Sequence, residues 1–480
     1  MNSEKYEVVV GLEVHAQLST KSKMYCGDNT EFGAAPNTQV SAISLGHPGT
    51  LPRVNKKAIE FAVKMGLATG CTIREENQFA RKNYFYADLP KGYQITQDKT
   101  PICEHGFLEF EVNGEKKRVG IQRIHMEEDA GKSTHDLDPY FTLVDLNRAG
   151  VPLIEIVSDP DIRSGDEAFQ YLMEVRKLLR YLDICDGNME EGSMRCDANI
   201  SIRLKGDTHF NQRVEVKNMN SMRNVKKAIE FEFERQIALL EKGEALHQET
   251  RGFDATKGIT LSQRSKEHAH DYRYFPEPDL PPVRVTPAYV EAVRANMPKL
   301  ASTLHQEYTS VYGLPDYDAR VITEDRDSAM YFNEILKHTK NYKAASNWML
   351  GPVKSYLNEQ AIEIAQFPLT ATAIAGLIAL IDEGKTNFSV AAQKIFPEMV
   401  ANPNQSPITV AERLNLLQNS DASEIATLVD DVLTRFPEKV AEYKAGKKGL
   451  MGLFVGEVMK GSQGKADPKI VNKILTEKLL

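Results

Sequence analysis

The stretch YEVVVGLEVHAQL, Tyr6 to Leu18, decides the fold class because its apolar and polar residues alternate. Successive side chains of a β-strand point to opposite faces, so this alternation predicts a strand with one apolar and one polar face. Glu13, His15 and Gln17 share the polar face. A carboxylate and an imidazole two residues apart can bind the same cation. The alternative interpretation is an ordinary solvent-exposed face with a chance polar pair.

Further strand patterns and two long amphipathic helices follow within the first 290 residues. The expected strands are Leu108 to Val112, Arg118 to Met126, Leu153 to Val157, Asn199 to Leu204 and Arg213 to Lys217. The expected helices begin near Ser164 and Met222 and end near Leu182 and Gly243. Because strands and helices do not alternate regularly, the pattern favours an α+β domain with a largely antiparallel sheet over a doubly wound parallel one.

Prolines indicate where this first domain ends. The segment FPEPDLPPVRVTP, Phe275 to Pro287, carries five prolines, too many for the interior of a strand or helix. Helical patterns dominate from Ala288 onward, and the Asn- and Pro-rich stretch around Pro403 indicates a second boundary. We therefore predict an α+β domain over residues 1–290, an all-α helical domain over 291–404 and a small all-α tail over 405–480.

Composition excludes several classes of protein. The 480 residues are 41% hydrophobic and 26% charged, which is typical of globular proteins. A net charge of −8 excludes a wholly basic nucleic-acid binder. The longest apolar stretch, Ala371 to Ile381, is far shorter than the roughly 18 residues of a membrane span. Without an export signal, and with five scattered cysteines, we expect a soluble cytoplasmic protein with no membrane partner.

Acidic residues concentrate at two places in the middle of this domain. The stretch HMEEDAGKSTH, His125 to His135, contains Glu128 but lacks the first glycine of a P-loop, so a nucleotide would bind differently. Glu155 lies between apolar neighbours in VPLIEIV. A carboxylate buried there needs a cation, or else a partner such as Arg148.

A third polar group of residues lies in MEEGSMRCDANIS, Met189 to Ser201. Alternation places Asp197 on the polar side of a strand, with Arg195 on the same side. Mg²⁺ prefers oxygen ligands and shares them with substrate phosphates, and Arg and Lys bind phosphate oxygens. Together these residues favour a phosphoryl-transfer surface. The alternative is a solvated polar sheet face.

The C-terminal 40 residues differ in charge from the rest of the chain. Between Ala441 and Leu480 there are eight lysines and four acidic residues, a local net charge of +4. Lys447, Lys448 and Lys460 lie in a glycine-rich part of this segment, which could hold an RNA phosphate backbone. The alternative is a solvated helix face.

Across nearly its whole length the sequence resembles the family of B subunits of aspartyl/glutamyl-tRNA amidotransferases. The blocks that carry the resemblance are VGLEVHAQL (Val10 to Leu18), FGAAPN (Phe32 to Asn37), RKNYFYADLPKGYQITQ (Arg81 to Gln97), HMEEDAGKSTH (His125 to His135), DLNRAGVPLIEIVSDPDIRS (Asp145 to Ser164), MEEGSMRCDANIS (Met189 to Ser201), EVKNMNS (Glu215 to Ser221), ETRGFD (Glu249 to Asp254) and DYRYFPEPDLPP (Asp271 to Pro282). Nine blocks in the family's order are highly specific.

The resemblance implies a cradle-shaped catalytic domain, a helical domain and a tail that contacts tRNA. It implies that Glu-tRNA(Gln) becomes Gln-tRNA(Gln), or that Asp-tRNA(Asn) becomes Asn-tRNA(Asn). ATP and Mg²⁺ would activate the carboxylate as an acyl phosphate, and ammonia from an amidase-type A subunit would displace the phosphate. A small C subunit would clamp A to B. The alternatives are a non-catalytic tRNA-binding scaffold and a free-standing metal-dependent kinase or ligase.

The resemblance also suggests roles for individual residues. The expected metal ligands, which are also the catalytic candidates, are Glu13, His15, Glu128 and Glu155, with Glu191 and Asp197 as further ligands. We expect the ammonia exit and the aminoacyl end of the tRNA at Lys82, Tyr84, Tyr86 and Lys91. Phosphate contacts are expected from Arg195, Lys217 and Arg273, and tRNA contacts from Lys447, Lys448 and Lys460.

One departure from the family concerns zinc. Many members carry four cysteines early in the chain, where this sequence has Cys26, Asp28, Ser41 and Ser44. One soft ligand of four cannot hold structural zinc, so we expect none.

Overall fold

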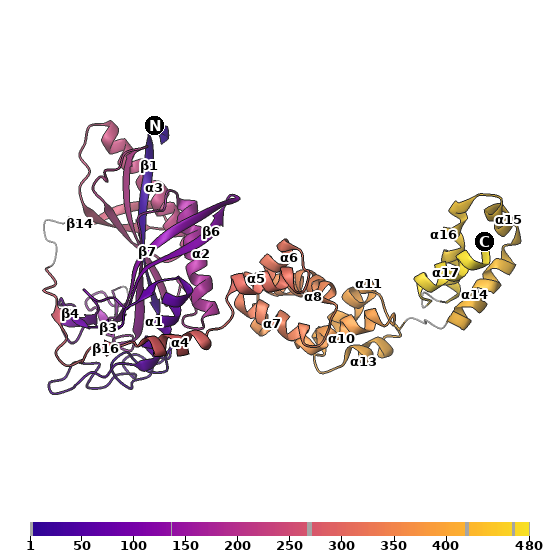
Figure 1. The fold of residues 1–480 in the computed structure, drawn as a ribbon, viewed down its shortest axis with the longest axis horizontal. Coiled ribbons are helices and arrows are strands. Elements are labelled where there is room, and N and C mark those ends of the chain that lie inside the picture. The colour runs from indigo at the N-terminus through magenta and orange to yellow at the C-terminus, as the bar shows by residue number, and fades with distance from the viewer. Residues whose placement is uncertain (1–2, 136, 266–270, 418–421, 463–465, 480) are drawn as a thin grey trace. The chain divides into compact units, whose positions relative to one another are not determined.

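The computed structural model describes residues 3–135, 137–265, 271–417, 422–462 and 466–479. The chain divides into two compact units, Met1–Leu300 and Ala301–Leu480. The first unit combines a large sheet with helices, whereas the second is helical (Figure 1). The predicted α+β class with an all-α C-terminal region is confirmed.

A single large sheet forms the centre of the first unit. Its described strands are β1 (Tyr6–Gln17), β2 (Thr72–Ile73), β6 (Cys103–Val112), β7 (Glu115–Glu128), β10 (Pro152–Ser158), β11 (Met194–Leu204), β12 (Val214–Met219), β13 (Glu249–Asp254) and β14 (Ile259–Ser265). Their order across the sheet is β14-β13-β12-β11-β1-β10-β7-β6-β2. Among these neighbours only β12 and β13 are parallel, so the sheet is largely antiparallel, as predicted.

Three helices cover one face of the sheet: α1 (Lys56–Ala68), α2 (Gly165–Tyr181) and α3 (Met222–Glu241) (Figure 1). Helices α2 and α3 begin at the predicted positions because Ser164 and Ser221 cap them, each hydroxyl accepting a hydrogen bond from a backbone N–H of the first turn. Leu12 and Val14 of β1 are fully buried in the core that includes these helices. The alternating residues Glu13, His15 and Gln17 therefore lie on the other, polar face.

Smaller sheets bring distant segments of the first unit together. Strand β15 (Phe275–Pro276) pairs with β4 (Ala80–Asn83), which pairs with β5 (Tyr93–Thr96). The remaining pairs are β16 (Val283–Arg284) with β3 (Glu76–Asn77) and β8 (Lys132–Thr134) with β9 (Leu143–Asp145). The 3₁₀ turn η1 (Ser3–Lys5) precedes β1, and helix α4 (Pro287–Ala295) packs on α1. The proline-rich segment thus belongs to the first unit.

The second unit consists of short helices. Those before the tail are α5 (Ala301–Ser310), α6 (Asp316–Thr323), α7 (Arg326–Leu336), α8 (Tyr342–Trp348), η3 (Met349–Val353), α9 (Lys354–Gln360), η4 (Ile364–Gln366), α10 (Ala371–Asp382), α11 (Phe388–Val390), η5 (Ala391–Ile395), α12 (Phe396–Ala401) and α13 (Pro407–Arg413). No helix in the described ranges is long and apolar enough to cross a membrane.

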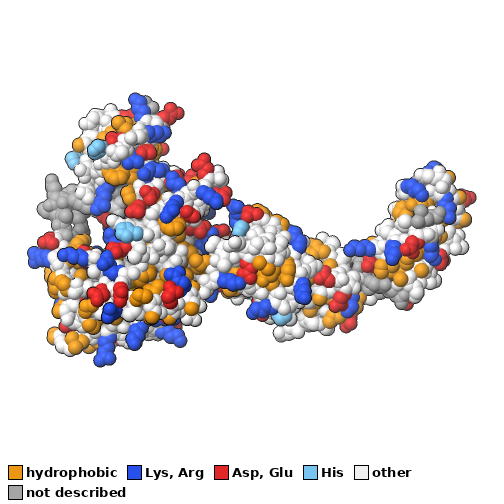
Figure 2. Space-filling view, in the orientation of Figure 1, with side chains coloured by type: hydrophobic (Ala, Val, Ile, Leu, Met, Phe, Trp, Pro, Cys, Tyr) orange, Lys and Arg blue, Asp and Glu red, His pale blue; other side chains and the backbone are white. Residues whose placement is uncertain are grey.

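The last helices of the chain have a hydrophobic core of their own. They are α14 (Ala422–Arg435), α15 (Pro437–Lys444), η6 (Lys448–Leu450), α16 (Met451–Gly461) and α17 (Pro468–Leu479). Val429, Phe454 and Leu475 are fully buried in this core. Acidic and basic side chains are interspersed over the visible surface of both units (Figure 2). The boundary near residue 404 between a helical domain and a tail stays a prediction.

Candidate active site

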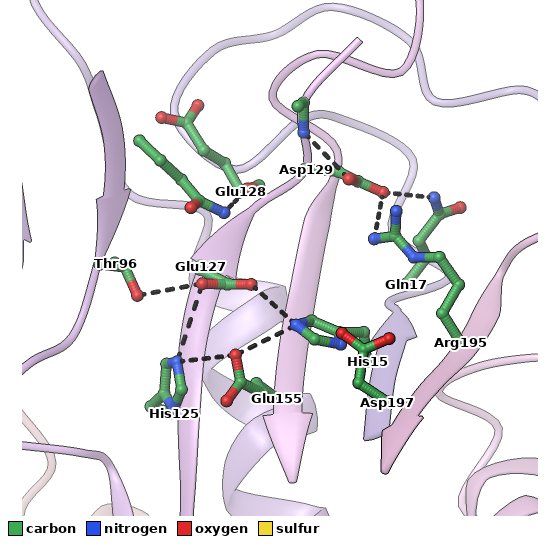
Figure 3. Close-up of polar contacts among 12 residues, drawn as sticks. His15, Gln17, Thr96, His125, Glu127, Glu128, Asp129, Glu155, Arg195 and Asp197 are labelled. Atoms are coloured by element: carbon green, nitrogen blue, oxygen red, sulfur yellow. Dashed lines mark hydrogen bonds and ion pairs between the residues drawn. The ribbon is translucent and has the colours of Figure 1, made fainter. Parts of the chain in front are cut away.

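Strand register gathers two histidines and two glutamates on the polar face of the sheet. His15 of β1 lies opposite Glu155 of β10, and Glu155 lies opposite His125 of β7. Glu127 follows His125 by two residues and so shares its face. The four side chains converge in the middle of the sheet (Figure 3).

The donor atoms of these side chains lie within the range of a shared cation. His15 Nε2 is 3.1 Å from a Glu155 carboxylate oxygen and 3.6 Å from one of Glu127. His125 Nε2 is 3.5 Å from Glu155 and 3.7 Å from Glu127. One ligand atom each of His15, Glu127 and Glu155 lies within 4.8 Å of the others. Two carboxylates and an imidazole are suitable ligands for a divalent cation.

Neighbouring charges shift the pKa values of this cluster. Burial alone would lower the pKa of His15, but the hydrogen bond and charge of Glu155, with the charge of Glu127, raise it to about 9. Burial alone would raise the pKa of Glu155, yet the neighbouring His125 and His15 hold it well below its usual range. A proton on the imidazole therefore compensates the carboxylates, and a divalent cation would replace that proton.

A buried aspartate fixes an arginine beside this cluster. Asp129 accepts hydrogen bonds from Arg195 Nη2 at 2.9 Å and from Gln17 Nε2 at 2.7 Å (Figure 3). Burial would raise the pKa of Asp129, but Arg195 and Arg148 hold it below its ordinary value. The guanidinium of Arg195 is thus anchored on one side. Neither Asp129 nor Gln17 was a sequence candidate for the site.

Glu13 and Asp197 form a second polar pair on neighbouring strands. They lie opposite each other on β1 and β11. Glu13 accepts a hydrogen bond from Asn199 Nδ2 at 2.8 Å, and burial raises the pKa of Glu13. Asp197 pairs with Lys217, whose ammonium also lies 3.0 Å from Glu215. These two acids therefore adjoin the cluster but already have protein partners.

A cavity of about 650 Å³ opens over these residues. Its lining includes His15, Glu127, Asp129, Asp197, Lys82, Tyr84, Arg195 and Lys217. Acidic groups and an imidazole thus occupy one side, whereas the cationic groups of Lys82, Arg195 and Lys217 face the same space. This combination suits a substrate that carries phosphates together with a divalent cation.

Glu128, the other predicted catalytic glutamate, lies elsewhere. As the neighbour of Glu127 on β7 it faces the opposite side of the strand, where it pairs with Lys91 and accepts a hydrogen bond from Ile95 N at 3.0 Å. It lines a separate cavity of about 210 Å³ with Lys91 and Tyr25. The structure does not bring Glu128 to His15 and Glu155, because alternation along β7 separates it from Glu127.

The other candidates are spread over the surface. Glu191 is exposed in the turn before β11, outside the lining of the larger cavity. Tyr86 and Arg273 are exposed near the mouth of that cavity, where ring contacts link Tyr86 to Tyr84. Lys447, Lys448 and Lys460 are exposed in the tail. Glu127 and His125 are the functional candidates that the sequence predictions missed.

The positions that carry zinc ligands in other family members form hydrogen bonds here. Ser44 Oγ donates to Asp28 at 2.6 Å and accepts a hydrogen bond from Ser41 N at 3.0 Å. Burial raises the pKa of the Cys26 thiol. A hydroxyl pair and a protonated thiol are poor zinc ligands.

Comparison with known proteins defines the class of this fold and site. Residues 8–291 match the family described as GatB/GatE catalytic domain, and residues 330–479 match the GatB domain. The chain is 49% identical over 471 residues to the B subunit of the aspartyl/glutamyl-tRNA(Asn/Gln) amidotransferase of Thermodesulfovibrio yellowstonii, and the match covers 98% of each chain. It is 48% identical over 480 residues to the protein of that name from Bdellovibrio bacteriovorus, and this match covers 100% of each.

A third relative has the same name. This Geobacter sulfurreducens protein is 49% identical over 477 residues, 99% of each chain. The chain therefore belongs to the family of B subunits of the aspartyl/glutamyl-tRNA(Asn/Gln) amidotransferases. The resemblance found in its sequence motifs is confirmed.

Proposed function

We propose that this chain amidates the side-chain carboxylate of Glu-tRNA(Gln), Asp-tRNA(Asn) or both, as the B subunit of a glutamine-dependent ligase. A carboxylate oxygen attacks the terminal phosphorus of ATP and releases ADP, and ammonia then attacks the acyl carbon and releases phosphate. The observation that carries this proposal is the cluster of His15, Glu127 and Glu155, of which His15 and Glu127 line one cavity with Arg195 and Lys217.

The residues of the cavity have complementary tasks in this reaction. The donor set of His15, Glu127 and Glu155 fits Mg²⁺, since the buried carboxylate of Glu127 and the half-buried one of Glu155 need a compensating charge. When bound, Mg²⁺ neutralises phosphate charge during transfer. Arg195 and Lys217 offer N–H donors to phosphate oxygens. Burial alone would lower the pKa of Lys82, but Glu127 raises it, so this ammonium can hold an acyl or phosphoryl oxygen.

The buried cysteines are poor nucleophiles for releasing ammonia from glutamine. Burial raises the pKa of the Cys71, Cys103 and Cys196 thiols, and raises that of Cys185 to about 12, so none of them is a reactive thiolate. We therefore assign glutamine hydrolysis to an amidase-type A subunit and the clamping of A to B to a small C subunit. The exposed tail lysines Lys447, Lys448 and Lys460 would contact the tRNA, and the cytoplasm is where such tRNA is made.

Two other functions fit the observations less well. A non-catalytic scaffold needs no buried carboxylates around an imidazole, because burying them costs several kcal/mol in practice. A free-standing kinase or ligase would amidate its substrate from glutamine without partners, whereas the relatives of this chain are named as subunits of an amidotransferase.

The test is reconstitution. The purified chain is mixed with A and C partners, ATP, Mg²⁺ and either misacylated tRNA, and ADP and amidated tRNA are measured. We expect both products with glutamine, and also with ammonium salt when the A subunit is inactivated. Absence of ATP-dependent amidation on both tRNAs with either donor would overturn the proposal. Metal analysis of the same protein should find no stoichiometric zinc.

A further inference from the structure

The ammonium group of Lys217 is held between two carboxylates at the wall of the larger cavity. Lys217 lines that cavity, and its side chain is 38% exposed. Its Nζ donates a hydrogen bond to Asp197 and lies 3.0 Å from Oε1 of Glu215. An ammonium has three N–H donors. Among the described residues these two carboxylates take two of the donors, so the third is left for a ligand in the cavity.

A hydroxyl group holds Glu215 in turn. Thr250 Oγ1 donates a hydrogen bond to Oε2 of Glu215 at 2.9 Å. The two residues lie opposite each other on β13 and β12, the parallel pair of the sheet. Val214 and Val216, which flank Glu215 on β12, are buried in the core, so alternation directs Glu215 and Lys217 to the polar face. Thr250 therefore binds one carboxylate oxygen of Glu215 and leaves the other for Lys217.

A buried group of charges holds β13 directly beside Thr250. Glu232 of α3 is fully buried, accepts a hydrogen bond from Arg235 Nη2 at 2.9 Å and lies 3.1 Å from Arg251 Nε. Thr260 of β14 also donates a hydrogen bond to Glu232. Arg251 follows Thr250 along β13 and so points to the opposite face. Because losing one partner would leave a buried charge uncompensated, these contacts tie β13 and β14 to α3 in one arrangement.

The two carboxylates also keep Lys217 charged and in place. Burial alone would lower the pKa of Lys217, but Asp197 and Glu215 raise it well above its usual range. The group is therefore an ammonium at every pH near neutrality. A lysine side chain loses much rotamer freedom when it is fixed by a ligand. Here the protein has already removed this freedom, which lowers the cost of binding.

We propose that Glu215 and Thr250 are positioning residues that aim the ammonium of Lys217 at the phosphates of ATP. This inference rests on the proposed function, in which Lys217 binds a phosphate oxygen. Thr250 holds Glu215, Glu215 and Asp197 hold Lys217, and the remaining N–H of Lys217 donates to the phosphate. A donor that is placed in advance needs no reorganisation during the reaction. The competing interpretation is that these contacts only stabilise the sheet.

The first measurement is the reactivity of Lys217 itself in the assembled enzyme. Only an unprotonated amine is acetylated, so trace labelling with acetic anhydride, read by mass spectrometry, reports a change in the pKa of Lys217. The exposed Lys116 is the internal reference. We expect Lys217 to react several-fold faster in Glu215→Gln and, to a smaller extent, in Thr250→Val. Thr250→Ser keeps the hydroxyl and should react like the unmodified enzyme.

The second measurement separates ATP from ammonia in the reaction. The kcat/KM for ATP should fall by up to about 100-fold in Glu215→Gln, since a reacting group displaced by about 1 Å can cost that factor. It should fall less in Thr250→Val and recover in Thr250→Ser. The KM for ammonium salt, measured with an inactivated A subunit, should not change, because Lys217 contacts phosphates. The matched controls Glu230→Gln on α3 and Thr256→Val in the β13–β14 turn alter exposed residues and should change neither measurement.

Two results would overturn the inference. One is unchanged reactivity of Lys217 in both Glu215→Gln and Thr250→Val. The other is a loss of activity in Thr250→Val that Thr250→Ser does not restore, which would assign the contact to the stability of the sheet. A thermal melt checks that each variant is folded, and the two Thr250 variants carry the test if Glu215→Gln does not assemble.

Labelling needs no ATP and no turnover, so it is independent of the proposed function. Changed reactivity in the variants, together with no amidation by the unmodified enzyme, would refute the proposed function and leave the holding of Lys217 by Glu215 standing. Amidation by the unmodified enzyme with unchanged reactivity in the variants would do the reverse.

Discussion

The two units of the chain differ in how many charged side chains they bury. In the first unit the described buried side chains of the Asp, Glu, Lys, Arg and His types are Lys23, His125, Glu127, Glu128, Asp129, Glu232 and Glu277, whereas in the described part of the second unit Asp318 is the only one. Burying an ion costs several kcal/mol in practice, so a fold tolerates it where partners or function compensate. Four of the seven in the first unit, Lys23, Glu127, Glu128 and Asp129, line the two cavities. The second unit keeps its charges on the surface, where they can serve docking.

The largest effect is expected when Glu155 and Glu128, two carboxylates of the first unit with different surroundings, are replaced in turn. Glu155→Gln removes a ligand of the cation cluster, so Mn²⁺ binding, followed by electron paramagnetic resonance, should be lost. Amidation should fall by more than the about 10- to 100-fold that loss of an outer partner of a metal site costs. Glu128→Gln alters a carboxylate that already pairs with Lys91, so this variant should keep its Mn²⁺ affinity.

The reverse pattern would contradict this assignment. If Glu128→Gln abolished Mn²⁺ binding while Glu155→Gln retained it, Glu128 would be the ligand that the sequence motif suggested. Equal thermal melting of the two variants controls for unfolding.

A smaller effect is expected from the aspartate that anchors Arg195. Asp129→Asn keeps the shape of the side chain but removes the charge that fixes the guanidinium. We expect kcat/KM for ATP to fall by about 10- to 100-fold, as for other outer partners. In an Arg195→Ala background the same change should have little further effect, because the anchored group is gone. Additive losses in a double-mutant cycle measured by ADP release would separate Asp129 from Arg195.

The surface charges of the second unit should act on binding rather than on chemistry. Lys447 is 71% exposed, and Lys448 and Lys460 are exposed as well. Replacing Lys447 and Lys448 by Ala should lower the slope of log tRNA affinity against log salt by about one per lysine. The kcat at saturating tRNA should not change. A changed kcat with an unchanged salt slope would argue against tRNA docking on the tail.

The smallest effect is expected at the buried aspartate of the second unit. Asp318 accepts hydrogen bonds from Lys343 at 2.7 Å and from Ser346 at 2.6 Å, and these partners hold the pKa of Asp318 below its usual value against the effect of burial. Since Lys343 is half exposed, Asp318→Asn should cost about 1 kcal/mol of unfolding free energy at pH 7.

The sign of the pH dependence follows from the lowered pKa. The stabilisation is present above the unfolded-state pKa of about 3.9 and is lost as the pH falls through the lower folded-state pKa. The variant and the parent should therefore differ by a few degrees in melting temperature at pH 7 and converge as the pH falls through the lowered folded-state pKa of Asp318. A difference that persisted at low pH would assign the effect to packing.

Much of the first unit follows from alternation along single strands. The pattern of Tyr6 to Leu18 placed His15 on the polar face, and Ser164 marked the start of α2, as the structure confirms. The same reasoning applied to β7 would have put Glu127 and His125 with His15, and Glu128 on the other side. The grouping of Glu128 with His15 came from the resemblance to the family, without regard to strand parity.

Contacts between residues that lie far apart in the chain could not be predicted from the sequence. The contact of Asp129 with Arg195 spans 66 residues and depends on two strand registers, and the ring contact of Tyr84 with Tyr272 depends on a two-residue strand, β15, in a proline-rich segment. Neither leaves a periodic signal, because periodicity reports which face a residue takes and not which strand lies beside it.

The pairing of β4 with β15 also sets an order of events during synthesis. Arg81 forms two hydrogen bonds to Glu277, a residue 196 positions later in the chain. At roughly 5–20 residues per second, about 10 to 40 s pass between the appearance of these two residues on the ribosome. Until then Tyr84 has no Tyr272 beside it and the mouth of the cavity is unfinished. A chain truncated before residue 272 would thus lack the ring contact of Tyr84 with Tyr272.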